Sequence, residues 1–409
     1  MDGAGGRCKS VAMERLSPEQ AEEILASHAP RQGVERIGLD QALGRVAAQG
    51  MRALNPLPAF ETSAVDGFAV VGESRQSCAL IGRLYAGDGP APTLGPGQAL
   101  FVATGAVVPA DAGVAWQEEV TVEGQMVVLR HWPRPGDNVR HVGEEVRKGA
   151  SILGRGERLG PGQMALLRAT GVSEVSVRRP VTVAVLSVGS ELVEEGAFGP
   201  GMVRNTNGPW MAQQLVALGC EVISLTLGDD EARFEAEVRR LDSLCDLLLT
   251  TGGASKGPRD FVRRVSARLG RRTLVDGLLM RPGQPLQAFS GGHALWIALP
   301  GNPLATALGF DRLVRPLLAA MEGRGCEARS AQAYLKAALP PNRGKVPRFW
   351  PAELGLDDGR LEVRPASYGG SGAVSALRQL DAWVRSEPGQ GRIRAGSVVP
   401  VWIAHWGGR

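Results

Sequence analysis

The chain has 409 residues, a formal net charge of +4 and 22% charged residues. A chain of this length usually forms more than one domain. Because basic and acidic residues are interspersed, the charge pattern excludes a basic stripe for nucleic acid. No apolar run reaches the roughly 18 residues that a membrane helix needs, and residues 1–12 lack the apolar core of a signal peptide. We therefore expect neither a nucleic acid nor a membrane as partner.

Residues 1–12 are glycine-rich and polar, which predicts a disordered extension. The five cysteines of the whole chain are scattered and form no CxxC pair. This spacing predicts neither a zinc site nor a disulfide framework. Unbridged thiols are typical of a reducing compartment, so we expect a cytoplasmic protein.

The first half of the chain predicts two domains. A helix should begin after Ser17, which is followed by Pro18 at the first helical position, and a second helix is expected over Leu39–Ala48. Residues 13–54 and 141–178, with a helix near Gly162–Ala169, should form a discontinuous mixed linking domain. Short strands separated by Gly and Pro, such as Ala99–Ala103 and Gln125–Leu129, predict an inserted β domain at 55–140.

Residues 179–325 alternate buried apolar runs with amphipathic segments, which is typical of an α/β domain with a mostly parallel sheet. The expected strands are Val181–Leu186, Glu221–Leu227, Asp246–Thr250 and Ala294–Leu299. The expected helices are Pro209–Leu218, Glu231–Leu241, Phe261–Leu269 and Leu304–Leu318. Residues 326–409 return to short strands and turns, which predicts a C-terminal domain resembling a β-barrel. The fold class is therefore multidomain, α/β plus β.

Ligands of α/β sheets bind beyond the carboxyl ends of the strands, and several segments stand out there. The loop Thr250–Asp260 has two glycines, Gly252 and Gly253, whose backbone N–H groups can approach a phosphate closely at a helix start. An ordinary βα turn is the alternative. Pro300-Gly301-Asn302-Pro303 opens another helix and could hold an anion or be only a turn, and Arg281 in the similar segment Arg281–Pro285 could bind an oxyanion.

Carboxylates also lie at these strand ends. Glu191, Asp229 and Asp230 could together bind a hard cation such as Mg²⁺. Capping of the following helix by Asp229 or Asp230 is the alternative. Upstream, Asp66-Gly67 within Phe60–Ala69 is either a turn or part of a site.

Taken in order along the chain, these segments resemble the molybdopterin molybdenumtransferases, the family that includes the gephyrin E domain. The resemblance covers the chain from about Leu16. It rests on PLPAFETSAVDGFAV (56–70), ATGAVVP (103–109), HVGEEVRKG (141–149), SVGSEL (187–192), NTN (205–207), TTGGASKGPRD (250–260) and LPGNP (299–303).

The resemblance implies that adenylylated molybdopterin loses AMP while its dithiolene binds molybdate, giving molybdenum cofactor. It implies a homodimer in which the Asp66 loop of one subunit faces the α/β domain of the other. It also implies Mg²⁺ as cofactor and transient contacts with the adenylyltransferase and with apo-molybdoenzymes. The implied catalytic and metal-binding residues are Asp66, Glu191 and Asp229. The implied pterin, phosphate and oxyanion contacts are Thr104, Gly252, Gly253, Ser255, Lys256, Asp260, Arg281, Pro300, Gly301, Asn302, Pro303 and Ser371.

The chain departs from the family pattern near the expected site. Family members usually carry acidic residues at Ser190 and Asn205, a valine-like residue at Lys256, lysines at Arg281 and Gln284, a serine at Ala305 and an aspartate at Glu145. Lys256 adds a cation that could compensate for the lysine missing at Gln284. Either Lys345 or Arg348 is expected to meet the oxyanion.

These departures leave a second hypothesis, a catalytically weak or inactive paralogue that acts as a molybdopterin-binding or cofactor-binding assembly module. A third is molybdopterin adenylyltransferase, which shares a TTGG-type loop. That enzyme is a single domain, and it would leave residues 56–70 and the last domain unexplained.

Overall fold

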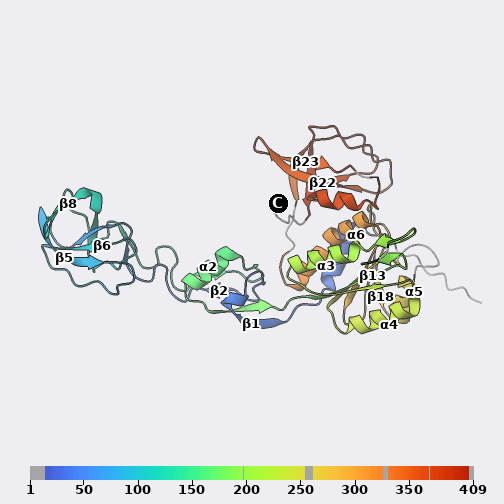
Figure 1. The fold of residues 1–409 in the computed structure, drawn as a ribbon, viewed down its shortest axis with the longest axis horizontal. Helices are drawn as coiled ribbons and strands as arrows, with labels where there is room; N and C mark the ends of the chain where they lie inside the picture. The colour runs from blue at the N-terminus through green and yellow to red at the C-terminus, as the bar shows by residue number, and fades with distance from the viewer. Residues whose placement is uncertain (1–13, 197, 254–260, 326–329, 368, 405–409) are drawn as a thin grey trace, which may run out of the picture. The chain divides into compact units, whose positions relative to one another are not determined.

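A computed structural model describes residues 14–196, 198–253, 261–325, 330–367 and 369–404. The chain divides into two compact units: residues 35–177 form one, and the segments before and after them form the other. Figure 1 follows the chain through both units. No helix among the described residues is both long and apolar enough to cross a bilayer.

A six-stranded sheet lies at the centre of the larger unit. In spatial order its strands are β16 (Glu221–Leu227), β13 (Thr182–Val188), β17 (Leu247–Thr251), β20 (Leu295–Leu299), β19 (Gln287–Ser290) and β18 (Arg272–Asp276). The first four run parallel, whereas β19 and β18 are antiparallel to their neighbours. The carboxyl ends of the parallel strands therefore meet at one edge, where the site is built.

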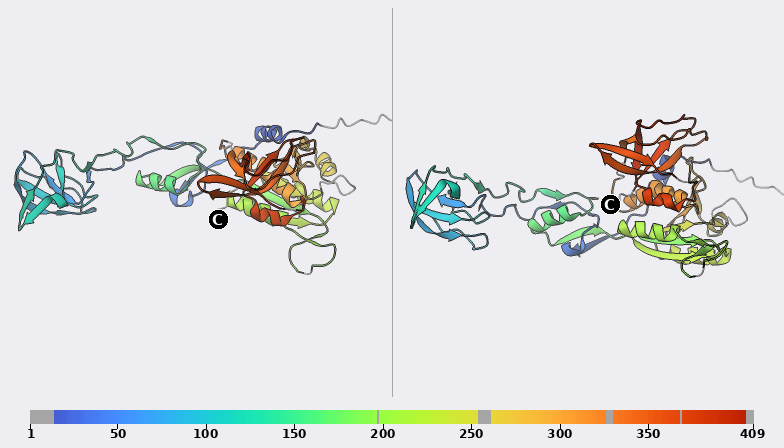
Figure 2. Two further views of the ribbon diagram at one scale, coloured as in Figure 1. Left: turned by 90° about the horizontal axis from the view of Figure 1, so that it is seen from above. Right: turned by 45° about the horizontal axis from the view of Figure 1, so that its top comes forward.

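Helices cover both faces of this sheet (Figures 1 and 2). Alternate strand residues face opposite layers: Val183 and Val185 pack with one group of helices, and Ala184 and Leu186 pack with the other. Burial on both faces explains why β13, β17 and β20 read as continuous apolar runs. The first layer contains α1 (Pro18–Ser27), α3 (Asn207–Ala217), α6 (Pro303–Gly309) and α7 (Arg315–Met321), and the second contains α4 (Glu231–Asp242) and α5 (Val262–Arg268).

A closed barrel follows in the same unit. Its strands are β21 (Ser330–Leu335), β23 (Arg360–Pro365), β22 (Arg348–Asp357), β24 (Ala382–Ser386) and β25 (Val398–Ile403), and η4 (Val374–Gln379) lies between β23 and β24 in sequence. Phe349 and Trp383 of the barrel belong to the same buried cluster as α6 and α7. The barrel and the α/β sheet thus confirm the predicted fold class.

The smaller unit contains a second six-stranded sheet and several short elements. The sheet order is β7 (Gly113–Trp116), β4 (Gly67–Val70), β6 (Gln98–Val102), β5 (Ser77–Leu84), β9 (Met126–Leu129) and β8 (Val120–Glu123), with η2 (Gln117–Glu119) before β8. The short elements are β1 (Val34–Gly38) with β12 (Glu174–Arg178), β2 (Met51–Arg52) with β11 (Ser151–Leu153), β3 (Thr62–Ser63) with β10 (Val139–Arg140), η1 (Leu39–Gln41) and α2 (Pro161–Ala169).

Two helix predictions need correction. The helix expected over Leu39–Ala48 is wrong: only Leu39–Gln41 is helical, because Gly44 has φ +78° and the chain then joins isolated bridges at Val46 and Ala47. The single helix expected over Leu304–Leu318 is α6 and α7 joined by a π-helical turn, η3 (Phe310–Val314). Pro316 lacks the N–H that a regular α-helix would need there.

Candidate functional site

The carboxyl edge of the parallel sheet encloses a cavity of about 390 Å³. It is lined by Val188, Gly189, Glu191, Asp229, Gly252, Gly253, Pro285, Pro300, Gly301 and Asn302. The strand register explains the meeting, since Ser187 pairs with both Thr226 and Thr251, and Thr251 pairs with Leu299. The structure thus brings together most of the residues expected at the strand ends. Ser255, Lys256 and Asp260 lie outside the described residues.

The two predicted glycines let the backbone approach its neighbours closely. Gly252 has φ +86°, and a Cβ there would lie 2.1 Å from the carbonyl oxygen of Val188. Gly253 has φ +65° and lies against the ring of Phe261. A side chain at Gly252 would therefore separate β17 from the end of β13.

We expect Gly252→Ala to lower both the melting temperature and the activity, because the methyl group would clash with backbone and strain φ. The added cost of the left-handed conformation alone is about 1 kcal/mol. Gly301→Ala is the matched control, since its Cβ would lie 3.6 Å from the Gly252 Cα, an ordinary contact. Thermal unfolding of the two variants checks this, and equal melting temperatures would contradict it.

The two neighbouring aspartates have different roles: Asp230 caps a helix, and Asp229 lines the cavity. Asp230 accepts a hydrogen bond from the backbone N–H of Arg233 at 3.0 Å and is the N-cap of α4. Asp229 lines the cavity instead, and its backbone N–H donates to Ser190 Oγ at 2.8 Å. Ser190, which departs from the family pattern, therefore ties the ends of β13 and β16 together.

Glu191 and Asp229 both line this cavity, so it contains two carboxylate side chains. The carboxylate of Glu191 folds back toward Gly189, where a Cβ would lie 2.8 Å from both of its oxygens. In the described part of the chain, no three or more His, Cys, Asp or Glu side chains gather closely enough to hold a metal. Two carboxylates beside open backbone still fit a hard cation that takes further oxygens from water or a phosphate.

A second cavity, of about 240 Å³, adjoins the first and shares Pro285, Pro300 and Asn302 with it. Its other lining residues are Arg281, Pro282, Gly283, Gln284, Ala305, Arg348, Gly370 and Ser371. The backbone explains why two arginines meet here: Arg281 N–H donates to the Pro347 carbonyl at 2.9 Å, and its own carbonyl accepts from Phe349 N–H at 2.8 Å. This cavity, which we call the arginine cavity, can bind an oxyanion.

Lys345, the alternative to Arg348, does not line this cavity. Its side chain is exposed, whereas the Arg348 guanidinium lies 3.8 Å from the ring centre of Trp350. Ser371 is also held in place, since its carbonyl accepts a hydrogen bond from the N–H of Leu304 at 3.1 Å. Arg348 and Ser371 therefore enter the cavity on anchored backbone.

Asn207 has a role that the sequence reasoning missed. Its Nδ2 donates to the Gly301 carbonyl at 2.7 Å and to Thr251 Oγ1 at 3.3 Å, which links the loop after β20 to the end of β17. Thr306 Oγ1 donates to the Pro300 carbonyl at 2.6 Å. These bonds fix the segment 300–303. The position of Asn207 in the quoted NTN motif was a signal that could have identified it.

Asp66 and Thr104 lie together in the smaller unit. The backbone N–H and the hydroxyl of Thr104 both donate to Asp66 Oδ1, at 2.7 and 3.0 Å. Gly67 must be glycine, because a Cβ would lie 2.1 Å from the Ala115 carbonyl oxygen. The Asp66-Gly67 pair is thus a built feature at the start of β4, with its carboxylate exposed.

The described cysteines lie in the interior and line none of the cavities at the carboxyl edge of the sheet. Cys78, Cys220 and Cys245 are buried and form no disulfide among the described residues. Burial raises the pKa of the Cys245 thiol to about 11, so this thiol stays protonated at neutral pH.

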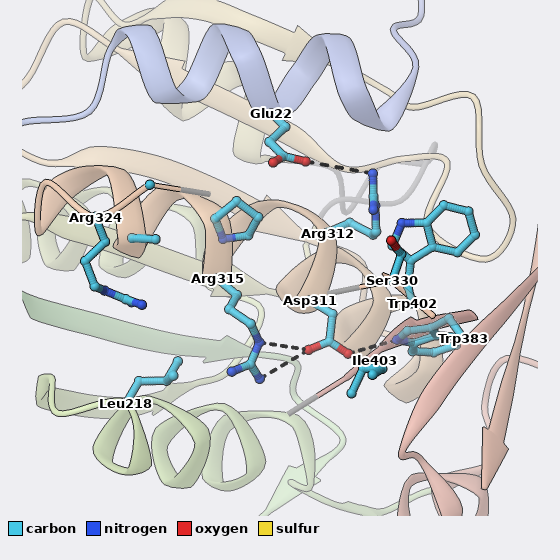
Figure 3. Close-up of a pocket in the computed structure, with 13 residues that line it drawn as sticks. Glu22, Leu218, Asp311, Arg312, Arg315, Arg324, Ser330, Trp383, Trp402 and Ile403 are labelled. Atoms are coloured by element: carbon cyan, nitrogen blue, oxygen red, sulfur yellow. Dashed lines mark hydrogen bonds and ion pairs between the residues drawn. The ribbon is translucent and has the colours of Figure 1, made fainter. Parts of the chain in front are cut away.

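A separate cavity of about 270 Å³ lies between α1, η3 and the barrel (Figure 3). Asp311 joins these layers: one oxygen accepts from Arg315 at 3.3 Å, and the other accepts from Trp383 Nε1 at 2.8 Å. The side chains of Asp311 and Arg315 are only 8% and 10% exposed. The contacts of Asp311 indicate a structural junction.

We expect Asp311→Ala to cost about 3 kcal/mol of unfolding free energy, because it removes the carboxylate from a buried ion pair. Denaturant unfolding followed by tryptophan fluorescence checks this value. Asp357→Ala is the control, since its ion pair with Lys336 is exposed and should matter little. Similar losses in the two variants would contradict the assignment of Asp311 to this junction.

Comparison with known proteins gives three consecutive family matches. They are "MoeA N-terminal region (domain I and II)" over residues 16–171, "Probable molybdopterin binding domain" over 184–320, and "MoeA C-terminal region (domain IV)" over 332–404. Curated relatives named molybdopterin molybdenumtransferase include one from Haemophilus influenzae, 32% identical over 90% of this chain and 93% of its own. Another, from Synechococcus elongatus, is 32% identical over 96% and 98%. A crystal structure of the molybdopterin biosynthesis moea protein from Pyrococcus horikosii is 29% identical, with a TM-score of 0.80 over 95% of this chain and 99% of that one.

Proposed function

Because this chain belongs to the molybdopterin molybdenumtransferase family, we propose that it inserts molybdate into adenylylated molybdopterin, releasing AMP and giving molybdenum cofactor. The observation that carries the proposal is the pair of adjoining cavities, one with carboxylates and open glycine backbone and the other with two arginines. A phosphoanhydride and an oxyanion are the ligands that suit them.

In this proposal the phosphoanhydride lies against Gly252, Gly253 and the segment Pro300–Pro303, whose backbone N–H groups orient its oxygens. Asp66, Glu191 and Asp229 would hold Mg²⁺, and a cation bound there would supply positive charge that offsets the negative charge of a phosphoanhydride. Arg281, Arg348 and Ser371 hold molybdate next to the dithiolene. The donor types support each assignment: carboxylates for the cation, and guanidinium and hydroxyl groups for the oxyanion.

The site is expected to need two subunits. The family resemblance implies a homodimer in which Asp66 of one subunit serves the α/β unit of its partner. Mixing inactive Asp66→Asn and Glu191→Gln homodimers should then restore about a quarter of wild-type activity, because half of the dimers are mixed and each mixed dimer has one intact site. Activity that stays at the level of the separate variants after subunit exchange would contradict the shared site.

The proposal is tested by incubating the protein with adenylylated molybdopterin, Mg²⁺ and molybdate. AMP release and reconstitution of an apo-molybdoenzyme are the expected results. Binding of molybdopterin without either result would instead support the inactive assembly module, which the departures at Asn205, Gln284 and Ala305 motivate. Adenylylation of molybdopterin with ATP would support the adenylyltransferase.

The unbridged buried thiols favour a cytoplasmic location.

A further inference from the structure

A third cavity, of about 550 Å³, opens on the same edge of the sheet. One side is formed by the loop between β14 (Leu192–Val193) and β15 (Val203–Arg204), which contributes Phe198 and Met202, and by Arg204 of β15. The Phe198 side chain is 61% exposed although it borders a cavity, and Met202 is also exposed. Large apolar side chains at the mouth of a cavity indicate an apolar or aromatic guest.

Arg204 holds Phe198 in position. Its guanidinium lies 5.3 Å from the centre of the Phe198 ring. The same group donates to the carbonyls of Glu194 and Gly196, at 3.3 and 3.0 Å. The two ends of the loop are joined by the parallel pairing of β14 and β15. The ring of Phe198 therefore lies against a guanidinium that is itself bound to the backbone at Glu194 and Gly196, which suits a stacking surface.

The lining residues that the cavities share show which cavities adjoin one another. The cavity with the carboxylates shares Val188, Glu191, Gly252, Gly301 and Asn302 with the Phe198 cavity, and it shares Pro285, Pro300 and Asn302 with the arginine cavity. Among the described residues, the Phe198 and arginine cavities have only Asn302 in common. The carboxylate cavity therefore lies between the other two.

The substrate of the proposed reaction has groups in a matching order. Its dithiolene, its phosphoanhydride and its adenosine follow one another along the molecule. If molybdate meets the dithiolene in the arginine cavity and the phosphoanhydride lies at the carboxylates, the adenosine must extend into the Phe198 cavity. We propose that Phe198, supported by Arg204, stacks on the adenine ring of the leaving AMP. This inference rests on the proposed function.

The test compares AMP with ribose 5-phosphate, which carries the same phosphate and sugar but no base. Calorimetric titrations in the presence of Mg²⁺ would use the wild type, Phe198→Ala, Phe198→Leu and Phe198→Trp. The wild type should bind AMP roughly tenfold or more tighter than ribose 5-phosphate. Phe198→Ala and Phe198→Leu should lose that preference, Phe198→Trp should keep it, and the affinity for ribose 5-phosphate should not change.

Tyr334→Ala is the matched control, because Tyr334 also lies under a guanidinium, that of Arg360 at 5.5 Å, but belongs to the barrel and lines none of the three cavities. It should bind AMP as the wild type does. The inference is overturned if the wild type does not prefer AMP, if Phe198→Ala and Phe198→Leu retain the preference, or if they weaken binding of molybdopterin itself while AMP binding is unchanged. AMP release by the wild type, measured on the same preparation, reports separately on the proposed function.

Discussion

Glu191→Gln is expected to slow AMP release by about 100-fold or more, with a melting temperature close to that of the wild type. The change keeps the size of the side chain and removes one of the two carboxylates that line the carboxylate cavity. Because Glu191 is exposed and belongs to no buried cluster, the fold should not depend on it. A single-turnover assay with adenylylated molybdopterin measures the rate, and thermal unfolding measures the stability.

Asp230→Asn is the control for this variant. Asp230 is a carboxylate at the neighbouring strand end, but it caps α4, and asparagine caps equally well. Its rate and stability should both match the wild type. If Glu191→Gln kept full activity, or lost activity only in proportion to unfolded protein, the role proposed for Glu191 and Asp229 in the reaction would be contradicted. If the proposed homodimer forms, Asp66→Asn should lower the rate as Glu191→Gln does.

Arg348→Ala should raise the molybdate concentration needed for half-maximal activity by roughly 10- to 150-fold. A hydrogen bond to a charged group contributes about 1.5–3 kcal/mol, which corresponds to that range. The variant leaves the carboxylate cavity unchanged. The rate at saturating molybdate should therefore change less than the molybdate concentration needed for half-maximal activity. Titrating molybdate in the insertion assay separates the two effects.

Lys345→Ala is the control, because Lys345 lies close in sequence but does not line the arginine cavity. It should leave the molybdate requirement unchanged. Gln284→Lys should lower the requirement, since it adds an ammonium group to the wall of the same cavity. An equal effect of the substitutions at Arg348 and Lys345 would show that the oxyanion is not held where the two arginines meet.

The sequence predicted the fold class wherever local pattern and burial agree. The apolar runs of β13, β17 and β20 are long because both faces are covered. These three strands and the edge strand β16 were found within two residues of their observed bounds. Local sequence also matches backbone at the hairpin turn Asp358-Gly359, where both residues have positive φ, as a two-residue loop requires. The antiparallel strands β18 and β19 carried no comparable pattern, and the segment after Leu39 is shaped by long-range pairing rather than by helical periodicity.

The site was predictable in its types of residue and only partly in its geometry. Pattern alone could not decide which of Asp229 and Asp230 caps α4, because both precede the helix, and the hydrogen bond to Arg233 settles it. Spacing could not identify Asn207, whose partners lie 44 and 94 residues away. Phe198 gave no signal at all, since its importance depends on a cavity that distant segments form.

Molybdate insertion by this protein is tested by a single-turnover time course with adenylylated molybdopterin and Mg²⁺, run with and without molybdate. With molybdate present, AMP and a cofactor able to activate an apo-molybdoenzyme should appear together and in equal amounts. A wild-type protein that binds the substrate but releases no AMP, or releases AMP without forming active cofactor, would contradict the proposed function.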